Sequence, residues 1–142
     1  MAVARGVSTK PRHRILLIED DRDLADLYRI GLCQRGYYVS VAHDGEEGLE
    51  LAVGLVPDLI LLDIRLPRLS GLQLLQFLRS RPQTRSIPAV VVSNYDADEL
   101  QRRGFDLGAL EWLLKVNTTP ADLIAWVDHW AEESAAVSGR RA

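Results

Sequence analysis

Five short apolar runs alternate along the chain with longer segments in which apolar residues recur every three or four positions. The apolar runs lie at residues 15–18, 37–42, 59–62, 89–92 and 110–114. Each run has the length of a strand, and each following segment has the spacing of an amphipathic helix. Five such units predict an α/β fold, a doubly wound (βα)5 arrangement whose five-stranded parallel sheet is covered by helices on both faces.

Residues that cap or break helices mark the ends of the expected helices. Asp21 caps the first helix, the Asp44-Gly45 pair opens the second, and Thr119, followed by proline, caps the last. Gly36 and Pro57 end the first two helices. The expected apolar positions are Leu24, Leu27, Tyr28 and Leu32 in the first helix, Leu49, Leu51, Ala52 and Leu55 in the second, Leu72, Leu75, Phe77 and Leu78 in the third, and Leu123, Trp126, Val127 and Trp130 in the last, while the fourth helix, 98–107, is polar. The two tryptophans are expected to anchor the last helix to the sheet.

Length and composition are typical of one globular domain. The chain has 142 residues, of which 47% are apolar and 26% are charged. No apolar stretch approaches the ~20 residues of a membrane span, and no signal-peptide core follows the basic N-terminus. The net charge of −3 gives no support for direct nucleic-acid binding. We expect a cytoplasmic domain at residues 13–133, between a basic flexible tail at 1–12 and a second flexible tail at 134–142.

Cysteine usage gives no sign of an oxidising compartment. Cys33 is the single cysteine of the chain, so an intramolecular disulfide is excluded. We expect Cys33 to be a small buried apolar residue on the first helix.

Polar side chains follow four of the five apolar runs, directly where each strand is expected to end. Glu19 and Asp20 follow the first run, Asp63 the third, Ser93 the fourth and Lys115 the fifth. In open parallel sheets, ligands bind outside the carboxyl ends of the strands. The sequence therefore predicts that these five side chains face one crevice.

The chemistry of these side chains fits magnesium and a phosphoryl group. Three carboxylates in one crevice raise one another's pKa unless a cation neutralises them, and Mg²⁺ prefers oxygen ligands of this kind. Lys115 is a compact positive charge suited to a phosphoryl oxygen, and Ser93 can donate a hydrogen bond to another. A carboxylate can itself be the nucleophile, which gives an aspartyl phosphate.

The ordered set of motifs resembles the response-regulator receiver domain of the CheY type over residues 13–133. The matching segments are ILLIEDD at 15–21, LILLDIRLPRLSG at 59–71, VVVSN at 90–94 and GALEWLLK at 108–115. The spacing between Asp20, Asp63, Ser93 and Lys115 also matches that family. The resemblance implies a flavodoxin-like fold and signal transduction in a two-component system or phosphorelay.

The resemblance implies a role for each residue at the strand ends. Asp63 accepts a phosphoryl group from a histidine kinase or a histidine phosphotransfer protein. The domain is therefore expected to be not an enzyme but a phosphoacceptor that catalyses its own phosphoryl transfer and autodephosphorylation. Glu19, Asp20 and Asp63 hold Mg²⁺ together with the backbone carbonyl of Arg65. Lys115 pairs with the phosphoryl group.

A conformational switch is implied as well. Ser93 moves toward the phosphoryl group, and the aromatic residue at Trp112 repacks inward. The surface formed by residues 97–131 (fourth helix, fifth strand and fifth helix) then changes its binding to a downstream protein target, and the same resemblance leaves a homodimer open. Because the residues after Glu133 are too few for an output domain, a stand-alone receiver is expected, and a fragment of a larger protein is the alternative.

Five positions around the expected site depart from the family pattern or differ in bulk. Trp112 stands where tyrosine or phenylalanine is commoner. Val116 replaces the usual proline after the lysine, so we expect a trans Lys115–Val116 peptide bond, because a non-proline cis bond costs about 3 kcal/mol. Asn94 replaces a common alanine. Arg65 and Tyr95 flank the site, where their bulk is expected to hinder an attacking water and prolong the life of the phosphoryl group.

Three other functions compete with the phosphoacceptor interpretation. A magnesium-dependent aspartyl phosphatase would carry a second acid/base aspartate two positions after the nucleophile, where this chain has Arg65. A flavodoxin-like cofactor binder would need a phosphate-cradling loop after the first strand, where Glu19, Asp20 and Asp21 would repel phosphate. The strongest alternative is a phosphorylation-independent docking module on a receiver fold.

Overall fold

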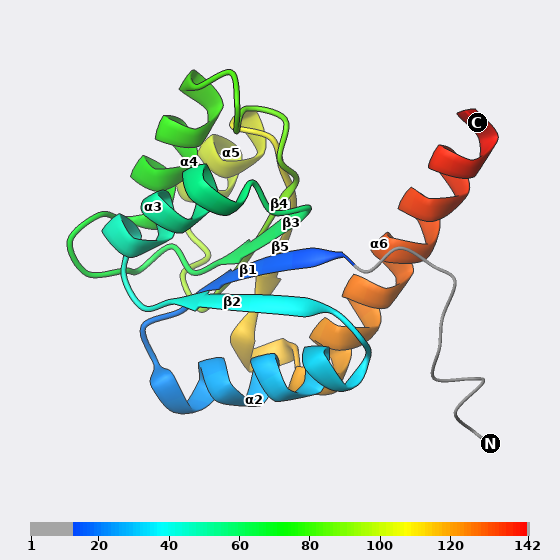
Figure 1. The fold of residues 1–142 in the computed structure, drawn as a ribbon. Helices are drawn as coiled ribbons and strands as arrows, with labels where there is room; N and C mark the ends of the chain where they lie inside the picture. The colour runs from blue at the N-terminus through cyan, green and yellow to red at the C-terminus, as the bar shows by residue number, and fades with distance from the viewer. Residues whose placement is uncertain (1–12, 142) are drawn as a thin grey trace.

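The five expected strands form one parallel sheet in the order β2-β1-β3-β4-β5 (Figure 1). The computed structural model describes the backbone of residues 13–141 and the side chains of residues 13–134. The strands are β1 (Arg14–Ile18), β2 (Tyr38–Ala42), β3 (Leu59–Leu62), β4 (Ala89–Ser93) and β5 (Ala109–Leu114). The helices are α2 (Arg22–Gln34), α3 (Gly45–Leu55), α4 (Gly71–Ser80), α5 (Asp98–Asp106) and α6 (Pro120–Arg141), and a short 3-10 helix, η1 (Lys115–Asn117), follows β5. The predicted (βα)5 fold is confirmed, while the expected basic tail at 1–12 lies outside the described residues.

Helices cover both faces of the sheet, which explains why its central strand is a continuous apolar run. α2 and α6 lie on one face, and α3, α4 and α5 lie on the other (Figure 1). All four residues of β3 are buried, and their side chains divide between the two apolar clusters. A strand enclosed in this way exposes neither side to water, so both of its faces are apolar.

The register of the sheet brings the polar residues that follow the strands together. Ile18 of β1 pairs with Leu62 of β3, so Glu19 and Asp63, which follow them, begin side by side. At the other side of the sheet Ser93 of β4 pairs with Leu114 of β5. All pairs are parallel, so every strand delivers its last residue to the same edge.

The expected caps begin the helices close to the ends of the strands. The carboxylate of Asp21 accepts a hydrogen bond from the Leu24 N–H at 3.1 Å, which confirms it as the N-cap of α2. Asp44 caps α3 in the same way, through the N–H of Glu47 at 2.8 Å. Thr119 accepts from the N–H of Asp122 at 3.0 Å at the start of α6. Each cap satisfies a helix N–H that has no partner within the helix.

The prediction of which residues of α2 are buried is partly wrong. The buried residues of this helix are Ala25, Tyr28 and Leu32, whereas Leu27 is 57% exposed and Cys33 is also exposed. Successive residues turn by about 100° around a helix, so a residue directly before Tyr28 or after Leu32 leaves the buried stripe. Cys33 is therefore a surface thiol and not the buried residue that we expected.

Two further helices show the same effect. In α4, Phe77 is 46% exposed, and Leu74 is fully buried together with Leu75 and Leu78. In α3, Leu55 is 38% exposed and Ala52 is buried. A large apolar side chain on an amphipathic helix does not by itself identify the face that meets the core.

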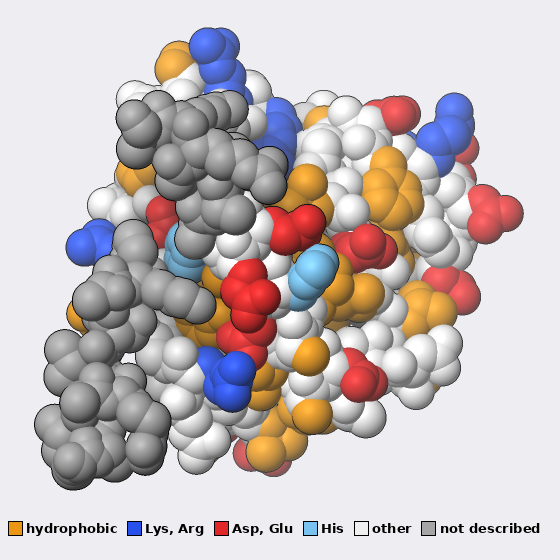
Figure 2. Space-filling model, turned by 90° about the vertical axis from the view of Figure 1, so that its right-hand side faces the viewer, with side chains coloured by type: hydrophobic (Ala, Val, Ile, Leu, Met, Phe, Trp, Pro, Cys, Tyr) orange, Lys and Arg blue, Asp and Glu red, His pale blue; other side chains and the backbone are white. Residues whose placement is uncertain are grey.

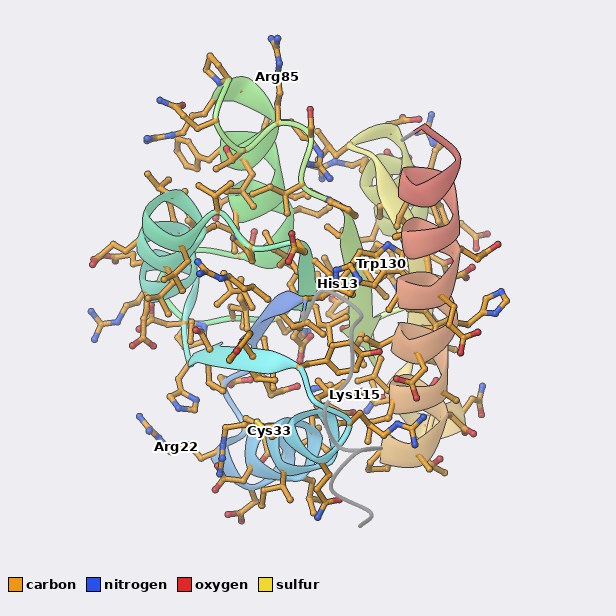
Figure 3. All side chains as sticks on the ribbon, turned by 45° about the vertical axis from the view of Figure 1, so that its right-hand side comes forward. His13, Arg22, Cys33, Arg85, Lys115 and Trp130 are labelled. Carbon is orange, nitrogen blue, oxygen red and sulfur yellow. The ribbon has the colours of Figure 1, made fainter. Side chains whose placement is uncertain are left out.

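α6 is longer than the sequence predicted, because the helix extends past the expected boundary at residue 133 to Arg141. The segment expected to form the second tail is thus helical over residues 134–141. Trp126 and Trp130 pack against the buried cluster between α2, α6 and the sheet, as predicted. Trp130 also meets the ring of His13 at a centroid distance of 4.9 Å (Figure 3).

The surface carries mixed charges. On the part of the face that Figure 2 draws in colour, acidic, basic and apolar side chains lie among one another. None of the helices in the described part of the chain has the length and apolar character needed to cross a membrane.

Candidate functional site

Three of the expected site residues are buried polar side chains at the carboxyl edge of the sheet. Glu19 is 2% exposed, Asp63 is 6% exposed and Ser93 is 1% exposed. Asp20 is exposed beside them, and Lys115 is half-buried. Ionisable groups are rarely this buried without a partner, so their neighbours decide what the site can do.

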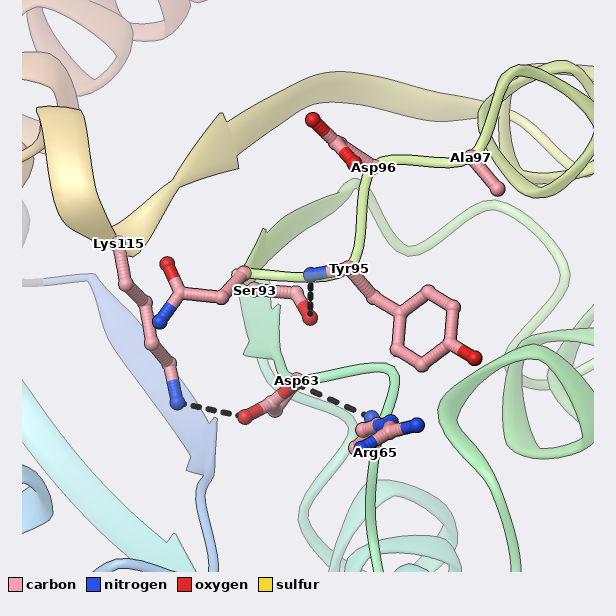
Figure 4. Close-up of a pocket in the computed structure, with 8 residues that line it drawn as sticks. Asp63, Arg65, Ser93, Tyr95, Asp96, Ala97 and Lys115 are labelled. Carbon is pink, nitrogen blue, oxygen red and sulfur yellow. Dashed lines mark hydrogen bonds and ion pairs between the residues drawn. The ribbon is translucent and has the colours of Figure 1, made fainter.

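Lys115 is the partner of the two buried carboxylates. Its Nζ lies 2.6 Å from Oδ2 of Asp63 and 2.7 Å from Oε1 of Glu19 (Figure 4 shows the contact with Asp63). The lysine comes from the end of β5, while Asp63 follows β3 and Glu19 follows β1. The structure therefore joins the predicted residues from three strand ends in one ion-pair cluster.

The carboxylates of Glu19, Asp20 and Asp63 form a set of oxygen donors that could hold a metal ion. One ligand atom from each residue lies within 4.8 Å of the others. Carboxylate oxygens are the donors that Mg²⁺ prefers, and Mg²⁺ commonly retains water in its remaining positions. Two buried carboxylates and one exposed carboxylate fit this ion, since the exposed side leaves room for water and a phosphate.

The electrostatics of the cluster follow from burial and pairing. Burial raises the pKa of Glu19 above its usual range, although the hydrogen bond from Lys115 and that from the Asp21 N–H partly oppose the effect. Burial would lower the pKa of Lys115, but its hydrogen bonds to Asp63 and Glu19 outweigh burial, and the pKa is raised. Lys115 is thus held as a cation between the two carboxylates.

Backbone hydrogen bonds orient the carboxylate of Asp63 and the hydroxyl of Ser93. Oδ1 of Asp63 accepts from the Arg65 N–H at 3.1 Å, which leaves Oδ2 to Lys115. Oγ of Ser93 accepts from the Tyr95 N–H at 3.2 Å. The hydroxyl hydrogen of Ser93 therefore stays available to an incoming oxygen.

Gly71 allows the loop after Asp63 to lie close to the start of α4. A Cβ atom at this position would stand 2.3 Å from the Asp63 carbonyl oxygen and 2.7 Å from Cα of Ile64. The N–H of Gly71 also donates to the Ile64 carbonyl at 2.9 Å. The glycine in the motif LILLDIRLPRLSG thus holds the turn that presents Asp63.

A pocket of about 500 Å³ opens in front of Asp63. Arg65 and Tyr95 form its rim, with the guanidinium carbon of Arg65 4.1 Å from the centroid of the Tyr95 ring (Figure 4). This distance is typical of a cation–π contact. The two residues expected to flank the site therefore do so as a stacked pair.

Trp112 is packed inward in this structure. It is 9% exposed, and its Nε1–H donates to the Tyr95 carbonyl at 2.8 Å. Gly104 of α5 makes room for the indole, because a Cβ atom there would stand 2.6 Å from Cζ3 of Trp112. The larger ring thus has both a niche and a partner for its N–H, and it connects β5 with the loop after Ser93.

The peptide bond between Lys115 and Val116 is trans, as expected, since no cis bond occurs among the described residues. The N–H of Val116 donates to Oδ1 of Asn94 at 2.9 Å. Asn94 and Val116 were noted in the sequence only as departures from the family pattern. Their contact was missed, although two departures at neighbouring strand ends were a signal that could have suggested it.

His43 is a second residue that the sequence did not single out. It follows β2, and its Nδ1 lies 3.0 Å from the Glu19 carbonyl oxygen. Its backbone N–H donates to Glu47 of α3 at 2.8 Å. His43 therefore supports the backbone at Glu19 from the neighbouring strand end, a contact that depends on the order of strands in the sheet.

Comparisons with known proteins agree with this geometry. A family model described as the response regulator receiver domain matches residues 15–128. The chain is 42% identical over 102 residues to the DNA-binding dual master transcriptional regulator RpaA of Synechocystis sp., covering 72% of this chain and 42% of that protein. It is 34% identical over 127 residues to the transcriptional regulatory protein CpxR of Escherichia coli, covering 85% of this chain and 53% of that protein. The chain thus spans about half the length of these curated relatives.

Solved structures show the same fold. The receiver domain protein (CheY-like) from Methanospirillum hungatei superposes with a TM-score of 0.78 at 28% identity, covering 87% of this chain and 96% of that one. The non-phosphorylated HemR receiver domain from Leptospira biflexa superposes with a TM-score of 0.77 at 28% identity, covering 84% and 94%. The chain therefore belongs to the response regulator receiver domain family, whose members are phosphoacceptors of two-component systems.

Proposed function

We propose that Asp63 is the phosphoacceptor of this chain and that it receives its phosphoryl group from a histidine kinase or a histidine phosphotransfer protein. The observation that carries this proposal is the cluster in which Lys115 Nζ lies between the carboxylates of Asp63 and Glu19. A carboxylate nucleophile needs no base, because it already carries the electron pair that forms the new bond. The site therefore has to neutralise charge and position groups, which is how phosphoryl transfer is usually catalysed.

The transfer balances as a displacement at phosphorus. A carboxylate oxygen of Asp63 forms the new O–P bond while the P–N bond of the phosphohistidine donor breaks. The donor imidazole leaves with the electron pair of that bond and takes up a proton. Lys115 stabilises the charge of the phosphoryl oxygens, and the hydroxyl of Ser93 can donate a hydrogen bond to one of them.

Glu19, Asp20 and Asp63 are the side chains that would hold Mg²⁺, and the backbone carbonyl of Arg65 is the further ligand that we propose. The bound ion would supply positive charge to the phosphoryl oxygens. The chain's own contribution is to keep the carboxylates together before the ion binds, through Lys115.

The proposed readout couples Ser93 and Trp112 to the surface of residues 97–131. Ser93 and Trp112 are the proposed switch, because the Tyr95 N–H donates to Ser93 and the Tyr95 carbonyl accepts from Trp112. A shift of Ser93 toward the phosphoryl group would thus move the backbone of Tyr95 and, through it, the indole of Trp112. The proposed partner of this surface is a downstream protein target, and not DNA.

We also propose that the stacked pair of Arg65 and Tyr95 prolongs the life of the phosphoryl group. The pair lies at the rim of the pocket in front of Asp63, where a water would have to enter for hydrolysis. Stacking restrains both side chains at this position, so their bulk is held over the opening.

Phosphorylation with a small donor tests the proposal directly. The protein is incubated with acetyl phosphate and Mg²⁺, and the intact mass is measured over time. Wild type should gain one phosphoryl group and Asp63→Asn none, whereas Asp96→Asn, which alters another aspartate lining the same pocket, should react like wild type. Labelling of Asp63→Asn at the wild-type rate would show that another residue is the acceptor.

Beryllofluoride binding tests the switch and the main alternative. Trp126→Phe and Trp130→Phe leave Trp112 as the single tryptophan, so a change in fluorescence on adding beryllofluoride and Mg²⁺ reports on it. If the chain is a phosphorylation-independent docking module, neither beryllofluoride nor acetyl phosphate should produce a response. That result, together with an unchanged mass, would favour the docking module.

A further inference from the structure

We infer that Asn94 positions Lys115 for phosphoryl transfer by accepting a hydrogen bond from the backbone N–H of Val116. The inference rests on the proposed function, since it names a residue that holds the cation of that site. Oδ1 of Asn94 lies 2.9 Å from the Val116 nitrogen. The bond joins the segment that follows β4 to the segment that follows β5, directly beside Lys115.

The bond between Asn94 and Val116 joins the two segments just beyond the last backbone pair of β4 and β5. The backbone pairing of β4 and β5 ends at Ser93 and Leu114. Past that pair, the acceptor for the Val116 N–H is the side chain of Asn94 rather than a backbone carbonyl. The backbone of Lys115 is therefore held on both sides. The pairing of Leu114 with Ser93 holds it before the lysine, and the hydrogen bond of the Val116 amide holds it after the lysine.

Fixing the backbone of Lys115 matters because its side chain must reach two carboxylates at once. Nζ lies 2.6 Å from Asp63 and 2.7 Å from Glu19. A lysine side chain has four rotatable bonds, and holding it in one geometry costs conformational entropy. A displaced backbone would add to that cost, and in phosphoryl transfer the position of each charged group determines the rate.

Asn94 and Val116 are complementary departures from the receiver pattern. Proline, the usual residue at the position of Val116, has no N–H, and alanine, common at the position of Asn94, has no side-chain acceptor. In this chain a donor and an acceptor are present together and meet. Val116 is 76% exposed, so packing does not account for its place, and its backbone N–H is the group that interacts.

The first test is the rate of phosphorylation of the full chain by acetyl phosphate with Mg²⁺. Asn94→Ala removes the acceptor and should slow the reaction about fivefold, the factor that corresponds to one ordinary hydrogen bond. Asn117→Ala is the matched control, since it removes a neighbouring asparagine whose side chain bonds to none of the described residues. Val116→Ala keeps the N–H. Both controls should react at the wild-type rate.

The second test observes Lys115 without any phosphoryl donor. Lysine labelled with ¹⁵N gives signals from only two residues, Lys10 and Lys115. Asn94→Ala should shift the side-chain ammonium signal of Lys115 and, in a second sample labelled uniformly with ¹⁵N, should speed hydrogen exchange of the Val116 amide. Asn94→Asp, which keeps an oxygen at the same place, should preserve the slow exchange of the Val116 amide. A residue that only stabilised the fold would change the melting temperature without moving the Lys115 signal.

The outcomes separate this inference from the proposed function. If wild type is phosphorylated and Asn94→Ala reacts equally fast with an unchanged Lys115 signal, Asn94 has no positioning role and the proposed function stands. If wild type takes up no phosphoryl group at all, the proposed function fails, and a positioning role in that reaction fails with it. A slower Asn94→Ala with a shifted Lys115 signal, beside unaffected controls, supports the inference.

Discussion

The two ends of the sheet each hold a partly buried cation, and the partners of the two cations differ. At the carboxyl ends of the strands, Lys115 lies between the carboxylates of Asp63 and Glu19. At the amino ends, Arg79 of α4 reaches the loops that precede β4 and β5. The acceptors of Arg79 are the backbone carbonyls of Leu107 and Ile87 at 2.7 Å, Arg85 at 3.0 Å and Thr84 at 3.5 Å.

Because their partners differ, Arg79 and Lys115 can serve different purposes. Burial lowers the pKa of Arg79, and its Nε and Nη1 groups donate to neutral carbonyls that belong to the fold. The pKa of Lys115 is raised, against burial, by hydrogen bonds to carboxylates that border an open pocket. A metal ion or a phosphoryl group can replace or join those carboxylate contacts. Arg79 therefore stabilises the fold, whereas Lys115 is available for chemistry.

Removing Arg79 should destabilise the fold at the amino ends of the strands without changing the reaction at their carboxyl ends. Arg79→Ala is expected to lower the free energy of unfolding by about 3 kcal/mol, because several backbone carbonyls lose their donor. The rate of phosphorylation per folded molecule should stay close to wild type. Urea unfolding and the acetyl phosphate assay measure the two effects. Arg81→Ala, an exposed arginine of the same segment, is the control, and a rate that falls with stability would remove the distinction between the ends.

Removing Lys115 should have the opposite profile. Lys115→Met keeps the apolar part of the side chain but should slow phosphorylation on the order of a hundredfold, since the charge that stabilises the phosphoryl oxygens is lost. Lys115→Arg should recover part of the rate, because the charge returns with a different shape. The intact-mass time course gives the rates. Equal rates for wild type and Lys115→Met would show that this lysine is as structural as Arg79.

The rim of the pocket gives a smaller effect that acts on hydrolysis alone. Arg65→Ala should shorten the life of the phosphoryl group about fivefold, because the cation–π contact with Tyr95 that holds the rim is lost. The decay of the phosphorylated mass after removal of acetyl phosphate measures this lifetime. Arg68→Ala, a nearby arginine that pairs with Asp44, should leave it unchanged. A lifetime unaffected by either change would show that the rim does not restrict water.

The smallest effect concerns Glu19 and pH. The folded-state pKa of Glu19 is raised, so the folded protein binds more protons than the unfolded chain once the pH exceeds the usual value of 4.5. The free energy of unfolding of wild type, relative to Glu19→Gln, should therefore fall as the pH rises from 4.5 through the raised pKa. Urea unfolding with a metal chelator present measures the difference. A difference that grows with pH would contradict the raised pKa.

Much of the site could be predicted from the sequence because it depends on the order of elements. Apolar runs followed by Glu19, Asp63, Ser93 and Lys115 place those residues at one edge of any parallel sheet that buries the runs. The structure shows Lys115 in direct contact with two of them, Glu19 and Asp63. The position of a residue directly after a strand does not depend on which face of a helix is buried. The wrong predictions for Leu27 and Cys33 therefore did not affect the predicted site.

Contacts between loops could not be predicted in this way, because they depend on distances that no local pattern encodes. The stacking of Arg65 on Tyr95 joins the loops after β3 and β4. The bond from Trp112 to Tyr95 needs the niche that Gly104 leaves in α5. Asn94 and Val116 meet only because β4 and β5 are neighbours in the sheet.

The sequence by itself determined which side chains meet at the carboxyl edge of the sheet, because a buried parallel strand must end in a loop there and the residue type decides what can bind. Tertiary structure alone decided how those residues are held. Arg79 shows this most clearly, since nothing in its helical segment indicates that its guanidinium reaches carbonyls both of the loop that follows α4 and of the distant loop before β5. Strand order and the close packing of helices on the sheet set those distances, and both arise only when the whole chain folds.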